Sequence, residues 1–196
     1  KTAATIDMIS KGRLELGVGM GWQAEEYHVA GVPFENRAEI FWETLEICKL
    51  LWAESPASHD GNVYQFKDIW CQPQPMQGAD LPLLFGLKMT TKNAEKIAQI
   101  GHGWIPIKTD AEFISTGKVL LDQAFKEHNR NEAPRIRGQL PTQIDSSGVP
   151  SLDLTLKELE NSIAAGLTEV EIFPINFVRS KEDIVPVLQA ISEIKG

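Results

Sequence analysis

Short apolar segments alternate with longer stretches of helical periodicity along most of this 196-residue chain. Strands and helices that alternate in this way form βα units, which build a parallel sheet covered by helices. We count five such units, with predicted strands at residues 13–19, 81–85, 104–107, 135–140 and 169–173. A closed eight-stranded βα barrel takes roughly 250 residues. The sequence therefore predicts an α/β fold that is three strands short of a closed barrel.

Capping motifs predict where several helices begin, because a side chain at the N-cap satisfies a backbone N–H of the first turn. Asn36 and Glu39 have the spacing of a capping box, as do Thr155 and Glu158, and residues 180–183 are predicted to cap the last helix. The remaining predicted helices cover residues 90–100, where Thr90 or Thr91 is the cap, and 111–128.

The first predicted strand ends in a glycine-rich stretch. Residues 14–18 alternate between apolar and other residues, as in a strand, and Gly19 and Gly21 then lead to Trp22. Bare backbone at the carboxyl end of a strand indicates a ligand site in an α/β protein. The same glycines would also permit close packing of a helix on the strand, and these residues alone leave both interpretations open. Their spacing departs from G-x-G-x-x-G, so a Rossmann-type dinucleotide site is not expected.

A short helix follows, carrying Glu25, Glu26, Tyr27 and His28. The helix dipole favours carboxylates in a first turn, which accounts for at least one of the two glutamates. Spacing does not decide whether Tyr27 or His28 faces the site. The four histidines of the chain form no ligand grouping, so no metal site is expected.

Residues 53–80 are the one long irregular stretch, and an insertion of this length usually forms a functional loop or lid. Asp60 and Gly61 indicate a turn, and residues 63–66 a short edge strand. Ser58, His59 and Asp60 have the residue types of a catalytic triad, but three consecutive residues seldom converge in its geometry. We interpret them as solvated loop.

Composition excludes several classes of function. The net charge is −8, without a cluster of Lys or Arg, which argues against a nucleic-acid surface. No apolar run approaches the length of a membrane span. Cys48 and Cys71 are isolated, which favours a reduced, cytoplasmic setting. The chain begins with Lys1 within an apparent helix, and we expect that upstream sequence is absent.

Five spaced segments carry a resemblance to a known family: TIDMISKGRLELGVGMGWQAEEY, GVPFENRAEIFWETLEICKLLW, HDGNVYQF, PQPMQGADLPLLFG and AEKIAQIGHGWIPI. Together they resemble the luciferase-like monooxygenase superfamily, most closely the branch that uses the deazaflavin coenzyme F-420. The resemblance covers nearly the whole chain in the family's order. It implies a single (β/α)8 TIM-barrel domain, spanning residues 1–196, of which only about the last five βα units are present.

The resemblance also implies a cofactor-binding role for the first glycine-rich loop. Gly19, Met20, Gly21 and Trp22 match a loop that lies along the isoalloxazine or deazaflavin ring. In sugar-phosphate dehydrogenases of the superfamily, the position of Trp22 holds a catalytic glutamate. An indole cannot transfer protons as a carboxylate does, so we expect Trp22 to stack or pack instead.

A second cofactor-binding loop is implied at residues 86–91, where the family binds the cofactor phosphate with paired glycines and small residues. Only Gly86 keeps that pattern, while Leu87 and Lys88 depart from it. The charge of Lys88 and the hydroxyl of Thr90 could compensate, because N–H groups at a helix start already favour anions. The alternative is an ordinary helix start with an exposed lysine.

The sequence therefore predicts an oxidoreductase or monooxygenase that acts on a small organic substrate with reduced F-420 or FMN, with no nucleic-acid or membrane partner. The catalytic acid or base is unknown and is expected in the absent N-terminal part. Two alternatives stay open. One is an incomplete barrel that binds weakly or survives only as a homodimer, and the other is an unrelated barrel enzyme that binds a phosphorylated metabolite through residues 86–91.

Overall fold

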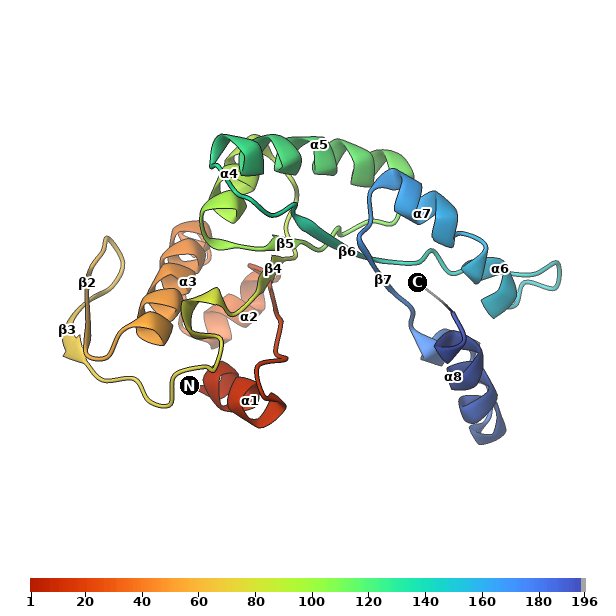
Figure 1. Ribbon diagram of the computed structural model, residues 1–196, viewed down its shortest axis with the longest axis horizontal. Coiled ribbons are helices and arrows are strands. Elements are labelled where there is room, and N and C mark those ends of the chain that lie inside the picture. The colour runs from red at the N-terminus through yellow and green to blue at the C-terminus, as the bar shows by residue number, and fades with distance from the viewer. Residues whose placement is uncertain (195–196) are drawn as a thin grey trace. The chain divides into compact units, whose positions relative to one another are not determined.

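The computed structural model describes residues 1–194, which form helices packed on short parallel strands (Figure 1). Two compact units make up the chain. The first runs from Lys1 to Leu87 and includes Ile100–His102, and the second contains Lys88–Gln99 and the residues from Gly103 onward. The assignment of the whole chain to a single domain stays a prediction.

The first unit combines a pair of parallel strands with an antiparallel hairpin. Strand β1 pairs in parallel with β4, with Val18 opposite Phe85. Strands β2 and β3 form the hairpin, which contacts helix α3 (Figure 1). The elements of this unit are α1 (Thr2–Ser10), β1 (Leu16–Val18), α2 (Ala24–Val29), α3 (Arg37–Ala53), β2 (Ala57–Asp60), β3 (Gln65–Ile69), the 3₁₀ helix η1 (Gly78–Asp80) and β4 (Leu83–Phe85).

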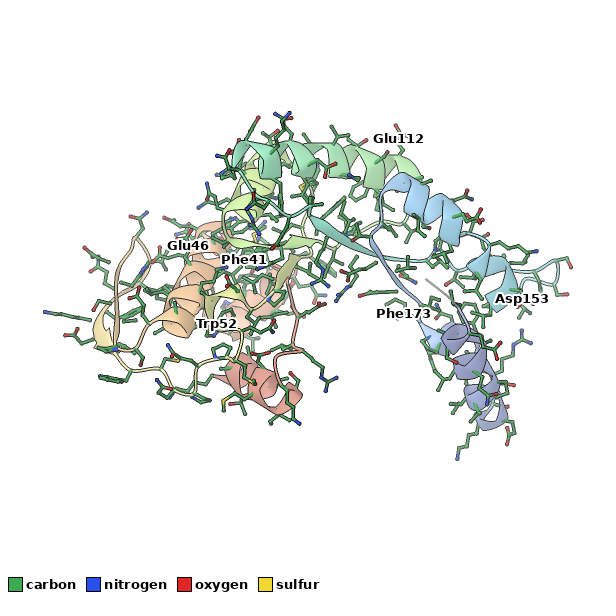
Figure 2. All side chains as sticks on the ribbon, in the orientation of Figure 1. Phe41, Glu46, Trp52, Glu112, Asp153 and Phe173 are labelled. Carbon is green, nitrogen blue, oxygen red and sulfur yellow. The ribbon has the colours of Figure 1, made fainter. Side chains whose placement is uncertain are left out.

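Strand β4 forms the core of the first unit, and all three of its residues are completely buried. The ring of Phe85 stacks on Trp42 of α3, with centroids 5.2 Å apart, and meets Phe41 edge-on at 6.2 Å. Figure 2 labels Phe41 on this helix. Burying one such side chain contributes about 1.5–3 kcal/mol, so the packing of α3 on β4 is a main source of stability in this unit.

Asp7 is a buried carboxylate that fixes helix α1. It accepts hydrogen bonds from the Gln77 backbone N–H at 3.0 Å, from the Gln77 side-chain amide at 2.8 Å and from the Leu14 N–H at 3.4 Å. Burial alone would raise the pKa of Asp7, but these hydrogen bonds outweigh it and hold the pKa below its ordinary value. The carboxylate therefore joins α1 to the segment before β1 and to the residue before η1.

The second unit is built on three parallel strands. Strand β6 pairs with β5, with Trp104 opposite Ile136, and also with β7, with Gly138 opposite Val170. Its elements are α4 (Thr91–Ile100, whose last residue belongs to the first unit), β5 (Gly103–Trp104), α5 (Ala111–Glu127), β6 (Arg135–Gln139), α6 (Leu152–Leu156), α7 (Leu159–Ala165), β7 (Glu169–Glu171), the 3₁₀ helices η2 (Pro174–Phe177) and η3 (Lys181–Asp183), and α8 (Ile184–Ser192).

Helix α5 packs closely on strand β5 through a glycine. Trp104 is completely buried, and a Cβ atom on Gly117 would lie 2.3 Å from its ring. Phe113, one turn earlier on α5, contacts the same ring with centroids 5.7 Å apart. Only glycine at position 117 therefore allows the helix to approach the strand this closely.

The two faces of strand β6 differ in polarity, as the alternation of side chains along a strand predicts. Ile136 is buried on one face. On the other, Arg135 and Arg137 both contact the carboxylate of Glu169 on β7. Burial would raise the pKa of Glu169, but the two guanidinium groups outweigh it and lower the pKa. Partly buried ion pairs therefore join β6 to β7.

The predicted βα order is confirmed, with shorter strands than expected. All five predicted strands are present, and the pairings β1–β4, β5–β6 and β6–β7 are parallel. The expectation that residues 53–80 are irregular is wrong in part, because residues 57–69 form the hairpin. Its first strand was missed because Ser58, His59 and Asp60 are residue types typical of turns.

Both predicted capping boxes are wrong. Asn36 occupies the N-cap of α3, but its side chain makes no capping hydrogen bond. Thr155 lies inside α6, where its hydroxyl donates to the Ser151 carbonyl, and Ser151 itself caps that helix. The predicted cap at residues 180–183 is confirmed, and it is a capping box with reciprocal bonds between Ser180 and Asp183.

The exposed apolar side chains of helix α8 lead us to predict that the chain associates with other copies of itself. None of its described residues is buried, and Ile184, Val185 and Leu188 are 42%, 60% and 50% exposed. Exposed apolar patches of this kind promote association. We expect the chain to sediment as larger species as its concentration rises, and a Val185→Lys, Leu188→Lys double variant to shift toward monomer. A Val119→Lys control alters one isolated exposed valine on α5. Monomeric sedimentation of the unmodified chain at every concentration would contradict the prediction.

Candidate functional site

The carboxyl ends of β1 and β4 lie side by side because the two strands pair in parallel. The Gly86 N–H donates to the Val18 carbonyl at 2.7 Å, which extends the pairing beyond β4. A Cβ atom on Gly19 would lie only 3.2 Å from the Gly86 carbonyl oxygen. The structure thus brings together two of the glycines predicted to bind a ligand, at the edge of the sheet where α/β proteins bind ligands.

The loop that follows β1 exposes backbone and one large aromatic side chain. Gly21 has a φ of +71°, in the left-handed region that residues with a side chain avoid. Trp22 is 79% exposed, so its indole is not part of the core. An exposed indole beside bare backbone offers a surface on which a planar ring can stack.

Tyr27, on helix α2, contacts this loop directly. Its hydroxyl donates a hydrogen bond to the Met20 carbonyl. Its ring meets Phe34 edge-on, with centroids 5.3 Å apart. Spacing alone does not distinguish Tyr27 from His28, but the structure does, because His28 is exposed and Tyr27 is half-buried against the loop. Tyr27 is therefore a residue of the candidate site that the sequence pattern could not select.

The second predicted loop runs from β4 to α4. Thr90 caps α4, since its hydroxyl accepts a hydrogen bond from the Asn93 N–H at 3.2 Å. The Asn93 side chain donates to the Lys88 carbonyl at 2.9 Å and so fixes the loop backbone. The side chains of Leu87 and Met89 are buried, whereas Lys88 is exposed. Lys88 is thus the side chain of this loop that can reach an anion in solvent.

A cavity of about 360 Å³ in the second unit is lined by Lys88 and by the start of α5. Asp110 caps α5 by accepting a hydrogen bond from the Phe113 N–H at 2.8 Å. Asp110 and Glu112 line the cavity together with Lys88, and Met89 and Phe113 provide apolar surface. The volume suits part of a small ligand, but the mixed charge of the lining does not define a simple anion site.

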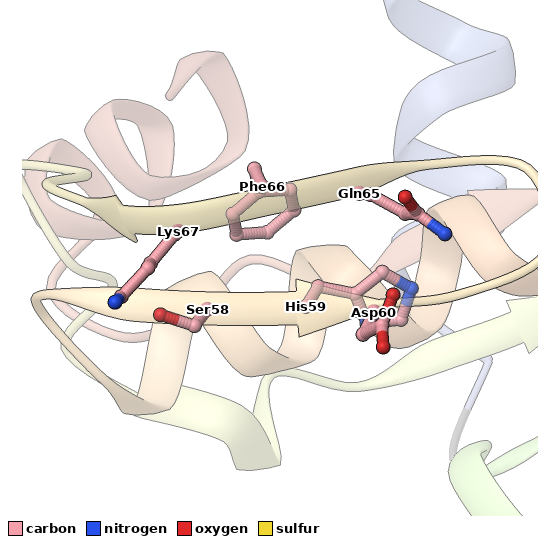
Figure 3. Close-up of a pocket in the computed structure, with 6 residues that line it drawn as sticks. All are labelled: Ser58, His59, Asp60, Gln65, Phe66 and Lys67. Atoms are coloured by element: carbon pink, nitrogen blue, oxygen red, sulfur yellow. The ribbon is translucent and has the colours of Figure 1, made fainter.

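A larger cavity, of about 540 Å³, lies on the β2–β3 hairpin, not at the strand ends (Figure 3). In Figure 3, Ser58 and Lys67 lie toward one end of the hairpin and His59, Asp60 and Gln65 toward the other. The Ser58 hydroxyl accepts a hydrogen bond from the Asp68 N–H at 2.9 Å, and in the described part of the chain no hydrogen bond joins the side chains of Ser58 and His59. These residues therefore form no triad, although they lie on a strand and not in the solvated loop that we expected.

Glu43 of α3 is a buried carboxylate that holds the turn of the hairpin. It accepts hydrogen bonds from the backbone N–H groups of Val63 at 3.0 Å and Tyr64 at 2.7 Å, and lies 3.2 Å from His59 Nε2. Burial alone would raise the pKa of Glu43. The hydrogen bonds from Tyr64, Val63 and His59 outweigh burial and lower the pKa. Glu43 thus has a structural role, and its partners are too distant in sequence for spacing to reveal them.

Residues 1–194 contain neither a metal-binding cluster nor a membrane-spanning helix. No group of three or more His, Cys, Asp or Glu side chains is placed to hold a metal ion. No helix in this part of the chain combines the length and the hydropathy needed to cross a bilayer.

The sequence profile of the luciferase-like monooxygenase family matches residues 1–147, which is more than half of the chain. The chain belongs to this family. The family assignment predicted from the sequence is therefore confirmed, and so is the α/β fold with a parallel sheet.

Curated relatives of this luciferase-like chain are longer than the matched region. An uncharacterized protein from Mycobacterium tuberculosis is 37% identical over 122 residues, which are 62% of this chain and 43% of the relative. The pyrimidine monooxygenase RutA of Acinetobacter baylyi is 32% identical over 114 residues, or 53% of this chain and 30% of the relative. The chain thus spans less than half the length of these relatives.

Solved structures share the fold at low sequence identity. The coenzyme F-420-dependent tetrahydromethanopterin reductase from Methanopyrus kandleri superposes with a TM-score of 0.74 at 15% identity, covering 98% of this chain and 78% of that one. The oxygenating constituent of 3,6-diketocamphane monooxygenase from Pseudomonas putida, in complex with FMN, gives 0.59 at 14% identity, covering 97% and 52%. The chain therefore has the luciferase-like barrel fold and covers only part of the barrel.

The Glu43 contacts predict how stability depends on pH. A carboxyl with a lowered pKa binds its proton more weakly in the folded state than in the unfolded state. Its contribution is therefore present above the ordinary glutamate pKa, about 4.3, and is lost as the pH falls through the lowered value. We expect Glu43→Gln to reduce the free energy of unfolding near pH 7 and to flatten its decline in acid, as measured by urea unfolding. A Glu54→Gln control removes an exposed carboxylate at the end of the same helix. Identical pH dependence in all three proteins would contradict the assignment.

Proposed function

We propose that this chain is the cofactor-binding part of an oxidoreductase that uses a reduced flavin-type cofactor, F-420 or FMN, on a small organic substrate. Membership of the luciferase-like monooxygenase family supports the reaction class. The relative RutA is named a pyrimidine monooxygenase, one of the two solved structures is a coenzyme F-420-dependent reductase, and the other is a complex with FMN. These names support both cofactors, so the choice between them is left to experiment.

The observation that carries the proposal is the meeting of Gly19 and Gly86 at the carboxyl ends of two adjacent parallel strands. A Cβ atom on Gly19 would crowd the Gly86 carbonyl, so the backbone there must be bare. Gly21 and the exposed Trp22 continue this surface. A planar ring fits such a surface because it can approach backbone closely and stack on an indole. Gly19, Met20, Gly21 and Trp22, with Gly86, are the proposed ring-side residues.

The phosphate-side residues of the proposal are Leu87, Lys88 and Thr90. Leu87 would act through its backbone, because its side chain is buried. Lys88 would supply positive charge from an exposed position. Thr90 uses its hydroxyl oxygen as the cap of α4, and its hydroxyl proton stays available for donation.

The cofactor, when bound, supplies the hydride transfer or oxygen activation, and the protein supplies binding, orientation and exclusion of water. The loop after β1 orients the ring, and Trp22 shields one side of it. Trp22 stands where sugar-phosphate dehydrogenases of the superfamily have a catalytic glutamate, so this loop offers no acid or base at that position. Glu25 and Glu26 on α2 are exposed carboxylates, and neither is assigned a catalytic role.

Substitutions at the two loops should weaken cofactor binding by separate routes. Gly21→Val strains a backbone with positive φ and places a branched side chain against the Tyr27 ring, which displaces the loop from its position along the cofactor ring. Lys88→Glu places negative charge beside the phosphate. We expect each to cost about 1–3 kcal/mol of binding free energy, the scale of backbone strain or of a lost charge-assisted hydrogen bond. Fluorescence titration of the parent chain and of each variant, with F-420 and with FMN, measures these losses of binding free energy.

Matched controls separate binding from folding. Gly31 has a φ of +69° with no atom near its added Cβ, so Gly31→Val introduces similar strain away from the ring surface. Lys157→Glu reverses an exposed charge at the end of α6. Both controls should bind like the parent. The proposal would be refuted if neither F-420 nor FMN bound the parent chain, or if both loop variants bound the cofactor with the affinity of the parent. Binding of FMN alone would retain the family function and reject the F-420 preference.

A further inference from the structure

The hydrogen bond between Tyr27 and Met20 fixes the orientation of one peptide group in the loop after β1. A trans peptide is planar, and its C=O and N–H bonds point in opposite directions. Since the Met20 carbonyl points at the Tyr27 hydroxyl, the N–H of Gly21 points away from it. Within residues 1–194, no hydrogen bond to the Gly21 N–H is found. One polar group of this peptide is therefore engaged by Tyr27, and the other is a donor available to a ligand.

The orientation of this peptide is not fixed by the loop itself. Gly21 has positive φ and lacks a side chain, and glycine permits wide backbone rotation. Trp22 is too exposed to anchor the loop by burial. An ideal Cβ on Gly21 would lie 3.7 Å from Cε2 of the Tyr27 ring, so the ring lies on the side of Gly21 that a side chain would occupy. The Tyr27 hydroxyl thus binds the peptide group next to Gly21, the glycine at which the backbone of the loop rotates most freely.

Tyr27 is in turn held by Phe34, which precedes α3 and is itself contacted by Arg37, the first residue of that helix. Its ring packs edge-on against Phe34. The Arg37 guanidinium lies 3.9 Å from the centroid of the Phe34 ring, and Arg37 also donates to the Phe34 carbonyl at 2.9 Å. Contacts of this kind between cations, aromatic rings and carbonyl groups orient side chains as well as stabilise them. The start of α3 therefore determines where the Tyr27 hydroxyl lies.

We propose that Tyr27 is a positioning residue of the cofactor site. Its hydroxyl fixes the Met20–Gly21 peptide so that the Gly21 N–H is presented to a hydrogen-bond acceptor on a planar heterocyclic ring. The inference rests on the proposed function, because it takes the loop after β1 to lie along a flavin-type ring. It adds a determinant of ring orientation that contacts the loop and not the ring, together with the Phe34 and Arg37 contacts that support it.

The test removes only the hydroxyl. Tyr27→Phe keeps the ring and its contact with Phe34, and Tyr64→Phe removes the chain's other tyrosine hydroxyl from an exposed position on the hairpin. Backbone ¹⁵N relaxation without cofactor should give rigid order parameters at Gly21 and Trp22 in the parent, near 0.85, and values below about 0.6 in Tyr27→Phe. Loss of one neutral hydrogen bond should raise the Kd of the cofactor about three- to tenfold. Tyr64→Phe should match the parent in both measurements.

The contact between Phe34 and Tyr27 allows a second variant that tests the same inference. Phe34→Leu keeps the Tyr27 hydroxyl but removes the aromatic edge that orients it. We expect its order parameters and Kd to fall between those of the parent and Tyr27→Phe, with the α3 signals unchanged. Rigid order parameters in Tyr27→Phe, or increased mobility with an unchanged Kd, would overturn this inference alone. A parent chain that binds neither F-420 nor FMN would overturn the proposed function instead, whatever the relaxation data show.

Discussion

Parallel pairing of β1 with β4 is the constraint on which the candidate site depends. The register places Val18 opposite Phe85, and the Gly86 N–H then reaches the Val18 carbonyl. Two loops that are far apart in sequence become neighbours because parallel strands deliver their carboxyl ends to one edge. A slip of one residue would turn every side chain of β4 to the opposite face. Phe85 would then lose its place against α3, and Gly19 would no longer meet Gly86.

Buried carboxylates secure the elements around this pair of strands. Asp7 joins α1 to the Gln77 region, and Glu43 joins α3 to the hairpin turn. Each accepts several N–H groups from loops that would otherwise have to satisfy them in water, and each has a lowered pKa as a result. Perturbed carboxylates are often sought as catalytic groups. In this protein each accepts hydrogen bonds from backbone N–H groups of other segments as well as from one side chain, which indicates a structural role.

Local patterns in the sequence predicted the strands and the glycine-rich loop, which depend on nearby residues. They did not predict the side-chain contacts between segments that are distant in the sequence. Alternation of apolar residues revealed the strands, and glycine spacing indicated the loop after β1. Ser151 caps α6 in place of Thr155 because the helix begins one turn earlier than predicted, and residue type alone does not distinguish the two hydroxyls. Glu43 accepts hydrogen bonds from residues of the hairpin turn, and the Tyr27 hydroxyl donates a hydrogen bond to the Met20 carbonyl in the preceding loop. These pairings depend on how the chain folds back, so spacing could not reveal them.

The contact between Gly117 and Trp104 has a consequence for how this sequence can vary. Alanine in the middle of a helix is ordinarily favoured over glycine by about 1 kcal/mol. At position 117 that preference is reversed, since the added carbon would overlap the indole. Substitutions at positions 117 and 104 are therefore coupled. A homologue with a larger residue at 117 needs a smaller one at 104, and an engineer who improves α5 by helix propensity alone would damage the core beneath it.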